Sequence, residues 1–171
     1  DDTIWLLVAA FVIAVGVSAS GLTGRLAAWL VTGTDHPRVL VHLVTAAIVA
    51  TVFAAPSTSG RAALLLPVYT SLASALRTGA DNDPALAASR KRLVHALSLI
   101  FPTVILLSAV GSFLGAGAHL VTSHIVASAG GQEFSFAGWL LLGLPLAALS
   151  SHLSTELIVW LFTRKEDMRR R

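Results

Sequence analysis

A short polar stretch between two apolar runs carries the residue types that bind small ions inside a membrane. Residues 56–61 read PSTSGR: a proline, three hydroxyl side chains, a glycine and an arginine. Proline and glycine interrupt helices, which leaves backbone groups unpaired. Free N–H groups at the start of the next helix attract an anion, and free carbonyls near Ala54 and Ala55 suit a small cation. The stretch therefore predicts a site for an anion and for the cation that drives its uptake.

Arg61 adds a charge to this stretch. A charge deep in a bilayer costs several kcal/mol unless it faces water, a partner or a ligand. Two roles are open for Arg61: it is the counter-charge of a dianion, or it pairs inside the protein, for example with Glu156. We expect Glu156 itself to reach the membrane interface. Structural roles are expected for four histidines near segment ends or on packing faces: His42, His95, His124 and His152.

A second interruption follows at residues 111–120, which read GSFLGAGAHL. Lipid offers unpaired backbone groups no hydrogen-bond partner, so nonhelical backbone in a bilayer is buried in protein or lines a watery cavity. Two breaks at comparable depth therefore predict a shared cavity. Small residues also let transmembrane helices approach closely, so tight packing is the alternative for residues 111–118.

The chain around these stretches has the composition of a membrane protein. Of its 171 residues, 55% are hydrophobic and 12% are charged, about half the charged fraction of soluble domains, and its mean hydropathy is +0.78. Without cysteine, it has neither disulfides nor thiolate metal ligands. We expect an all-α membrane protein. Because it starts at Asp1 with no signal-peptide layout, we also expect it to be part of a longer protein.

Segment lengths predict the elements that position the two breaks, because about 20 apolar residues cross a bilayer and shorter runs reach its middle. The expected segments are a transmembrane helix (1–21), an interfacial arm helix and turn (22–37), a re-entrant hairpin (38–76, tip at 56–61), a polar cytoplasmic loop (77–92), a discontinuous transmembrane helix (93–129, break at 111–118), an extracellular turn (130–135), a transmembrane helix (136–163) and a basic tail (164–171).

Basic residues predict the orientation. Whether the arms over 38–76 cross the bilayer or turn back, all but Arg61 of the 12 Lys and Arg residues fall on one side. The positive-inside rule makes that side cytoplasmic, which suits a multi-pass protein of the plasma membrane, or the inner membrane of a bacterium. Trp139 and Trp160, about 31 Å apart along a helix, are expected to anchor the last helix at both interfaces.

At these motifs the chain resembles a known family. PSTSGRAALLLP (56–67) is similar to the Ser-Asn-Thr signature of the divalent anion/sodium symporters, the dicarboxylate, citrate and sulfate transporters of the ion transporter superfamily. FLGAGAHLV resembles that family's Gly-Thr-Pro-Pro-Asn-Leu stretch, and ASGLTGRLAAWLV and FSFAGWLLLGLPLA resemble its flanking segments. The resemblance implies the first of two inverted repeats, which meet at a midplane site in a homodimer. It also implies a small anionic solute, Na⁺ or H⁺ as coupling ion, no further cofactor and no transition metal.

The resemblance implies site residues at both breaks. The anion would contact Ser57, Thr58, Ser59, Arg61 and His119. A sodium ion would lie among Ser57, Ser59, Gly60, Gly115, Ala116 and Gly117. Thr58 and Ser59 stand where the family has Asn and Thr. The residues from Gly117 to His119 replace Pro-Pro-Asn, which admits proton coupling through His119.

Three functions follow from these residues. We favour half of a secondary transporter, which by itself would transport nothing. An intramembrane serine hydrolase would need Ser57 or Ser59 to act with His119, but the sequence has no Gly-x-Ser-x-Gly elbow around these serines. A non-transporting membrane subunit would use the same segments for packing alone.

Overall fold

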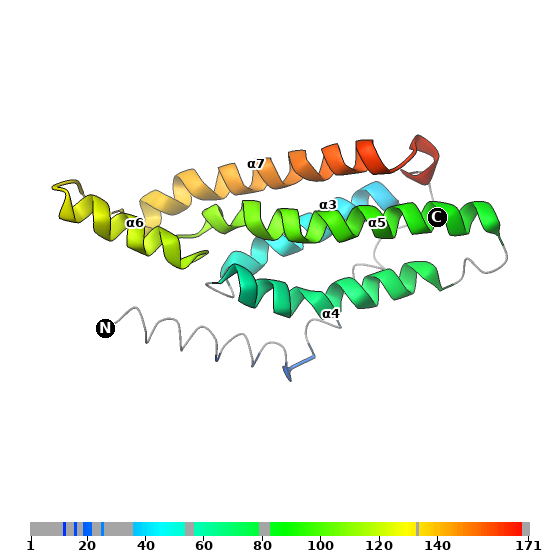
Figure 1. Cartoon of the computed structure of the whole chain (residues 1–171), viewed down its shortest axis with the longest axis horizontal. Coiled ribbons are helices and arrows are strands. Elements are labelled where there is room, and N and C mark those ends of the chain that lie inside the picture. The colour runs from blue at the N-terminus through cyan, green and yellow to red at the C-terminus, as the bar shows by residue number, and fades with distance from the viewer. Residues whose placement is uncertain are drawn as a thin grey trace.

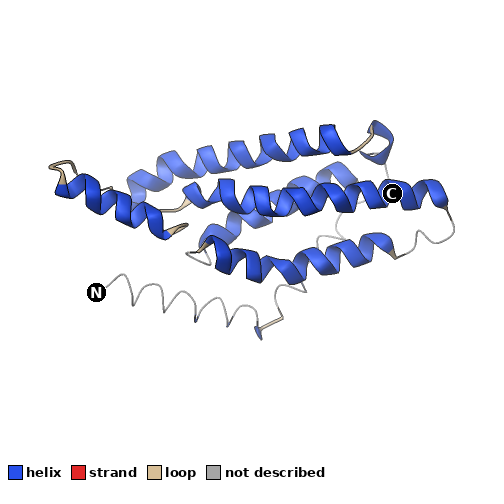
Figure 2. Ribbon diagram, in the orientation of Figure 1, coloured by secondary structure: helices blue, strands red, loops and turns tan. Residues whose placement is uncertain are grey.

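The computed structural model of the chain describes residues 12, 16, 19–21, 25, 36–53, 57–78, 83–132 and 134–168. Every element within these residues is a helix (Figure 2), as expected for an all-α protein. The helices predicted over 1–21 and 22–37 fall almost entirely outside the described residues, as do Ala54, Ala55 and Pro56 of the first break.

Five α-helices and three 3-10 turns make up the described fold. The α-helices are α3 (Pro37–Ala50), α4 (Thr58–Arg77), α5 (Pro84–Leu107), α6 (Gly117–Ser128) and α7 (Phe136–Phe162). The 3-10 turns are η1 (Thr51–Phe53), η2 (Ser108–Gly111) and η3 (Lys165–Met168).

The central helix is α5, because α3, α4 and α7 all pack against it. α3 also packs against α7, whereas α4 contacts chiefly α5. These helices run lengthwise past one another (Figure 1). We call the end that holds η1, the start of α4 and η2 the break end. The opposite end, which holds the starts of α3 and α5, the end of α4 and η3, is the basic end.

Apolar side chains at helical spacing form the core between α3 and α5. Leu40, Val44 and Ile48 follow one another at intervals of four residues on α3, and Ile100 and Val104 do so on α5. All five side chains are at most 1% exposed. This spacing keeps the apolar side chains of each helix on one face, which is why the two helices pack along their length.

Small residues bring α7 close to the rest of the fold. Its buried residues recur at every fourth position: Gly143, Ala147, Ser151, Thr155 and Val159. A Cβ on Gly143 would lie 2.3 Å from the carbonyl oxygen of Val110, so only glycine permits this approach of α7 to η2. Close approach through small residues is typical of helices packed in membranes.

Two described helices are long and apolar enough to cross a membrane, Pro84–Gly111 and Phe136–Phe162. The apolar part of the first is 56% buried within the chain, and that of the second only 17%. Leu142, for example, is 80% exposed. Most of α7 therefore presents apolar surface outward, where lipid or another part of the protein can cover it.

Residues 84–92, predicted as part of a polar loop, are helical instead. Asp83 explains the difference, because its Oδ1 accepts hydrogen bonds from the N–H groups of Ala85 (2.9 Å) and Leu86 (3.3 Å). This is the geometry of an N-cap aspartate, and Pro84 suits the first helical position. The polar residues that follow are the first turns of α5.

Candidate functional site

Arg61 lies at the centre of the break end, in the first turn of α4. Its side chain is completely buried, with an exposed fraction of 0%. The guanidinium donates to the carbonyl oxygens of Ile48 in α3 and Ile105 in α5, each at 3.2 Å. It also donates to the hydroxyls of Thr51 in η1 and Ser108 in η2. One side chain therefore joins the ends of α3 and α5 to the start of α4.

All these partners of Arg61 are neutral oxygens. Glu156, named as a possible partner from the sequence, binds Arg38 instead, with 2.6 Å between Nη2 and Oε2. Ile48 and Ile105 belong to the last turns of their helices, where the helix dipole places partial negative charge. Arginine stays protonated in proteins. The break end thus holds a buried positive charge that no described carboxylate pairs with.

Ser57 caps the start of α4. Its Oγ accepts a hydrogen bond from the N–H of Gly60 (3.3 Å), and its carbonyl accepts one from the N–H of Arg61 (2.9 Å). Serine is a preferred N-cap for this reason. Thr58 is half-buried and Ser59 is exposed. The first turn of α4 therefore carries hydroxyl groups around a helix N-terminus.

Residues 112–116, between η2 and α6, are not helical, and we call them the second break. The carbonyl of Ser112 accepts a hydrogen bond from the N–H of Gly115 (2.8 Å). A Cβ on Gly115 would lie 2.0 Å from the carbonyl oxygen of Ala109 and 2.8 Å from Cγ2 of Val52. Because Val52 belongs to η1, the two breaks lie side by side, and their contact requires glycine.

His119 and Trp139 pack together beside the second break. Nδ1 of His119 donates to the carbonyl of Ser112 (3.2 Å), and its ring centroid lies 4.7 Å from that of Trp139. Nε1 of Trp139 donates to the carbonyl of Val110 (2.8 Å). Trp139, expected at a membrane interface, thus satisfies a backbone carbonyl next to the break. Trp160 is 75% exposed, as an interfacial residue would be.

A groove of about 440 Å³ lies between α4 and α5. Thr58 and Ser59 contribute polar groups to its lining, which is otherwise mostly apolar and includes Phe101 and Ile105. The carbonyl of Ile105 also accepts a hydrogen bond from Arg61. The buried guanidinium is therefore bonded to a residue of the groove wall.

The predicted site residues fall into two groups. Thr58 and Ser59 share the groove, whereas His119 lies at the second break and does not line the groove. Contact between Val52 and Gly115 links the two breaks. The hydrolase alternative would need His119 to hydrogen-bond a serine hydroxyl; the hydrogen bond that its side chain makes to the described residues is from Nδ1 to the backbone carbonyl of Ser112.

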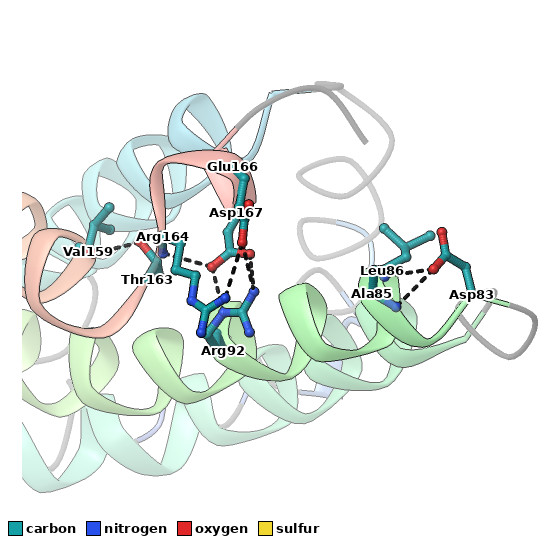
Figure 3. A network of polar contacts seen from close by, with 9 residues as sticks. All are labelled: Asp83, Ala85, Leu86, Arg92, Val159, Thr163, Arg164, Glu166 and Asp167. Carbon is teal, nitrogen blue, oxygen red and sulfur yellow. Dashed lines mark hydrogen bonds and ion pairs between the residues drawn. The ribbon is translucent and has the colours of Figure 1, made fainter.

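At the basic end, the segment after α7 is tied to α5 (Figure 3). Arg92 binds both carboxylate oxygens of Asp167, with Nε–Oδ2 of 2.7 Å and Nη2–Oδ1 of 2.6 Å. The backbone N–H of Arg164 donates to the same carboxylate (2.8 Å). The hydrogen bond from Arg92 lowers the pKa of Asp167 to about 2, although burial acts in the opposite direction. This buried carboxylate is therefore ionised at neutral pH.

Four polar side chains, Arg38, His42, His152 and Glu156, join α3 to α7. We call them the polar row. Arg38 binds Glu156 through Nε (3.0 Å) and Nη2 (2.6 Å). Nε2 of His42 lies 2.6 Å from Oε1 of Glu156, and Nδ1 of His42 lies 2.9 Å from Nδ1 of His152. Sequence reasoning missed this row. Its local signal was the four-residue spacing of His152 and Glu156, which places both on one face of a helix.

The described fold, with apolar helices interrupted at two adjacent breaks and an arginine buried between them, is compatible with an all-α membrane protein. Such breaks build solute and ion sites in secondary transporters. A family model described as the sodium:sulfate symporter transmembrane region matches residues 1–169. The chain belongs to this sodium:sulfate symporter family, which points to a transporter and not to an enzyme. The predicted resemblance is thus confirmed at the level of the family. A search of curated proteins finds no match.

Proposed function

We propose that the chain is the first repeat of a secondary active transporter that moves a small divalent anion together with Na⁺ or H⁺. The observation that carries this proposal is Arg61, a buried guanidinium bound to neutral oxygens where two broken helices meet. Membership of the symporter family supports the pairing of an anion with a cation. The particular anion would be sulfate or a di- or tricarboxylate such as citrate.

The charge balance of the break end favours an anion. The C-terminal ends of α3 and α5 and the N-terminal ends of α4 and α6 lie at the two breaks. Each helix end carries roughly half an elementary charge, so the two negative ends offset the two positive ends. The helix ends therefore do not balance the positive charge of Arg61. An anion placed near it would be attracted more strongly than in water, because the surroundings are less polar.

The proposal puts the anion in the groove, at the first turn of α4. Thr58 and Ser59 would donate hydroxyl hydrogen bonds, beside backbone N–H groups that the helix leaves free. Arg61 is buried, so it would position the breaks and supply the field without touching the solute. The coupling cation would lie between the breaks, with oxygen ligands from Ser57, Ser59 and the backbone near Gly60 and from residues 115–117.

In the complete protein, an inverted second repeat would supply the other half of the site, and two copies would form the homodimer. Cation binding would order the first turn of α4 and so raise its affinity for the anion. The site would then be exposed on the other side of the membrane by movement of the transport unit. The basic end would face the cytoplasm.

Uptake by the full-length protein in proteoliposomes tests this proposal. Labelled sulfate, succinate and citrate are offered with and without Na⁺ and at several pH values, and cation-dependent uptake of at least one is expected. Ser59→Ala and Thr58→Ala should each raise KM about tenfold, since each removes a hydrogen bond to a charged solute. Thr70→Ala, on an exposed part of α4, is the matched control.

Two results would contradict the proposal. Uptake that is independent of both Na⁺ and pH would refute the coupling of anion uptake to a cation. Uptake that survives alanine at Ser57, Ser59 and Arg61 would show that these residues only support packing, as in a non-transporting subunit.

A further inference from the structure

Two histidines meet in the polar row between α3 and α7, away from the proposed anion site. The rings of His42 and His152 are stacked, with centroids 5.1 Å apart. Their Nδ1 atoms lie 2.9 Å from each other. Two ring nitrogens at hydrogen-bond distance require that one carries a proton and the other offers a lone pair. A single shared proton therefore lies between the rings.

Glu156 fixes the other side of His42. Its carboxylate is bound by Arg38 through two nitrogen atoms, and such bidentate pairing favours the ionised form. Nε2 of His42, 2.6 Å from Oε1 of Glu156, must then carry a proton and donate it. In the neutral pair, Nδ1 of His42 is consequently the acceptor, and Nδ1 of His152 is the donor.

This arrangement can take up one proton and no more. The added proton binds Nε2 of His152, and the positive charge spreads over both rings when the shared proton moves to Nδ1 of His42. Three of the four ring nitrogens are then protonated, and the fourth accepts the hydrogen bond between the rings. Another proton would place two N–H groups against each other, which would break the contact.

The row opens toward the basic end. A cavity of about 570 Å³ includes Arg38, Glu156, Trp160 and Arg164 in its lining. The side chains of His42 and Glu156 are 30% and 35% exposed. A proton can therefore reach the pair from that end. In the other direction, the row continues into a buried hydrogen bond between the hydroxyls of Thr45 and Thr155 (2.7 Å).

Other charged and titratable groups near the row come from the elements packed against it. Around the cavity they are Arg164 and Lys165, and on α5 and η3 they are Arg90, Lys91, Arg92, His95, Glu166 and Asp167. Arg92 and Asp167 neutralise each other, and the ring of His95 packs on Phe162. Arg38 and Glu156 likewise form a neutral pair. Uptake of a proton thus changes the net charge of the polar row from zero to plus one.

We propose that His42 and His152 form a one-proton binding site, open to the basic end, through which the transporter responds to pH on that side. The added charge lies next to Glu156 and competes with Arg38 for its carboxylate. It therefore alters the contact between α7 and α3, the helix whose far end supplies Ile48 to Arg61. Control of uptake rests on the proposed transport function, whereas proton binding itself does not.

The direct test is nuclear magnetic resonance on the full-length protein with ¹⁵N-labelled histidine. We expect one pair of ring nitrogens to show a scalar coupling across the shared proton. H42Q and H152Q should each abolish that coupling, and H95Q, the matched control on α5, should leave it intact. As the pH is lowered, one added proton should change the nitrogen signals of both rings together. Absence of the coupling in the unchanged protein, or two independent titrations, would overturn the proposal.

Uptake measurements test the response to pH. Labelled sulfate, succinate and citrate are offered to sealed proteoliposomes of one orientation at fixed Na⁺, while pH is varied on the basic-end side alone. We expect sulfate uptake to change as one proton binds on that side, and this one-proton response to be lost in the H42Q/H152Q double variant but not in H95Q. An unchanged pH response in the double variant would overturn the link to transport. Failure to take up any of the three anions would instead contradict the proposed function, and the resonance experiment would still decide proton binding.

Discussion

Arg38 and Arg92 at the basic end and Arg61 at the break end are held in opposite ways. At the basic end, Arg38 and Arg92 each bind a carboxylate through two nitrogen atoms. At the break end, Arg61 is completely buried and binds carbonyl and hydroxyl oxygens. Arg38 and Arg92 are thus neutralised by acidic partners, whereas the break end keeps a charge that no described side chain cancels.

A charge that is neutralised in an ion pair therefore differs from a charge that remains available to attract a ligand. A carboxylate fixes an arginine and also cancels its field, so nothing remains for a ligand. Carbonyl groups also fix the guanidinium through hydrogen bonds, but they carry only partial charge. If the proposed function is right, the protein keeps an unneutralised charge at the breaks, whereas Arg38 and Arg92 are each neutralised by an acidic partner.

The largest effect is expected for Arg61→Met. This change removes every hydrogen bond of the guanidinium and leaves the carbonyls of Ile48 and Ile105 without these donors, so the free energy of unfolding should fall by about 3 kcal/mol or more. Thermal unfolding of the full-length protein in detergent measures the loss. Arg77→Met, at the exposed end of the same helix, should change the midpoint little. If the two changes lowered the thermal midpoint equally, the buried Arg61 would contribute no more to stability than the exposed Arg77.

Asp167→Asn tests the neutralised end. With a pKa of about 2 in the folded protein against 3.8 for a free carboxyl, the ionised form is favoured by about 2.5 kcal/mol. Because the folded pKa is the lower one, this stabilisation is present above about pH 4 and is lost as the pH falls to about 2. Unfolding followed as a function of pH should show that loss in the unchanged protein and not in Asp167→Asn. Glu166→Gln, at a carboxylate that is 67% exposed, is the control and should alter stability little.

A matched pair of glycines tests how tightly the breaks are joined. Gly115→Ala would force a Cβ into the carbonyl of Ala109 and should destabilise the protein by about 2 kcal/mol. Gly117→Ala, two residues later, meets nothing within 4 Å and should be neutral. Thermal midpoints of the two variants give the comparison. Similar midpoints would show that the breaks do not touch as described.

The smallest effect is expected for Ser57→Ala. Loss of the N-cap hydrogen bond to Gly60 should cost about 1 kcal/mol of stability, well below the loss for Arg61→Met. Ser57→Asp, which keeps an N-cap acceptor, should restore stability while adding a negative charge at the break. Its uptake of anions should therefore fall even though it unfolds like the unchanged protein. Normal uptake by Ser57→Asp would argue against an anion at this helix start.

The sequence predicted those features that depend on local chemistry. Helical class and family followed from apolar runs and the motif around Ser57. The partners of Arg61 did not follow, because backbone carbonyls at helix ends carry no signal in the residue types. Pairing of Arg38 with Glu156 was missed because 118 positions separate them. The spacing of the tryptophans predicted an interfacial role for Trp139. It could not show that the carbonyl of Val110 in η2 lies within hydrogen-bond distance of this side chain.

Few contacts hold α6, and this has a consequence for hydrogen exchange. Ser123 is the one buried residue of α6, and its hydroxyl accepts a hydrogen bond from the N–H of Phe134 (3.1 Å). By contrast, α5 is bound near both ends, by Arg61 and through Arg92. Amide hydrogens exchange when a segment opens locally, and segments with few buried contacts open most readily. In deuterated buffer, the amides of α6 should therefore exchange long before those of α5, with the boundary at the second break.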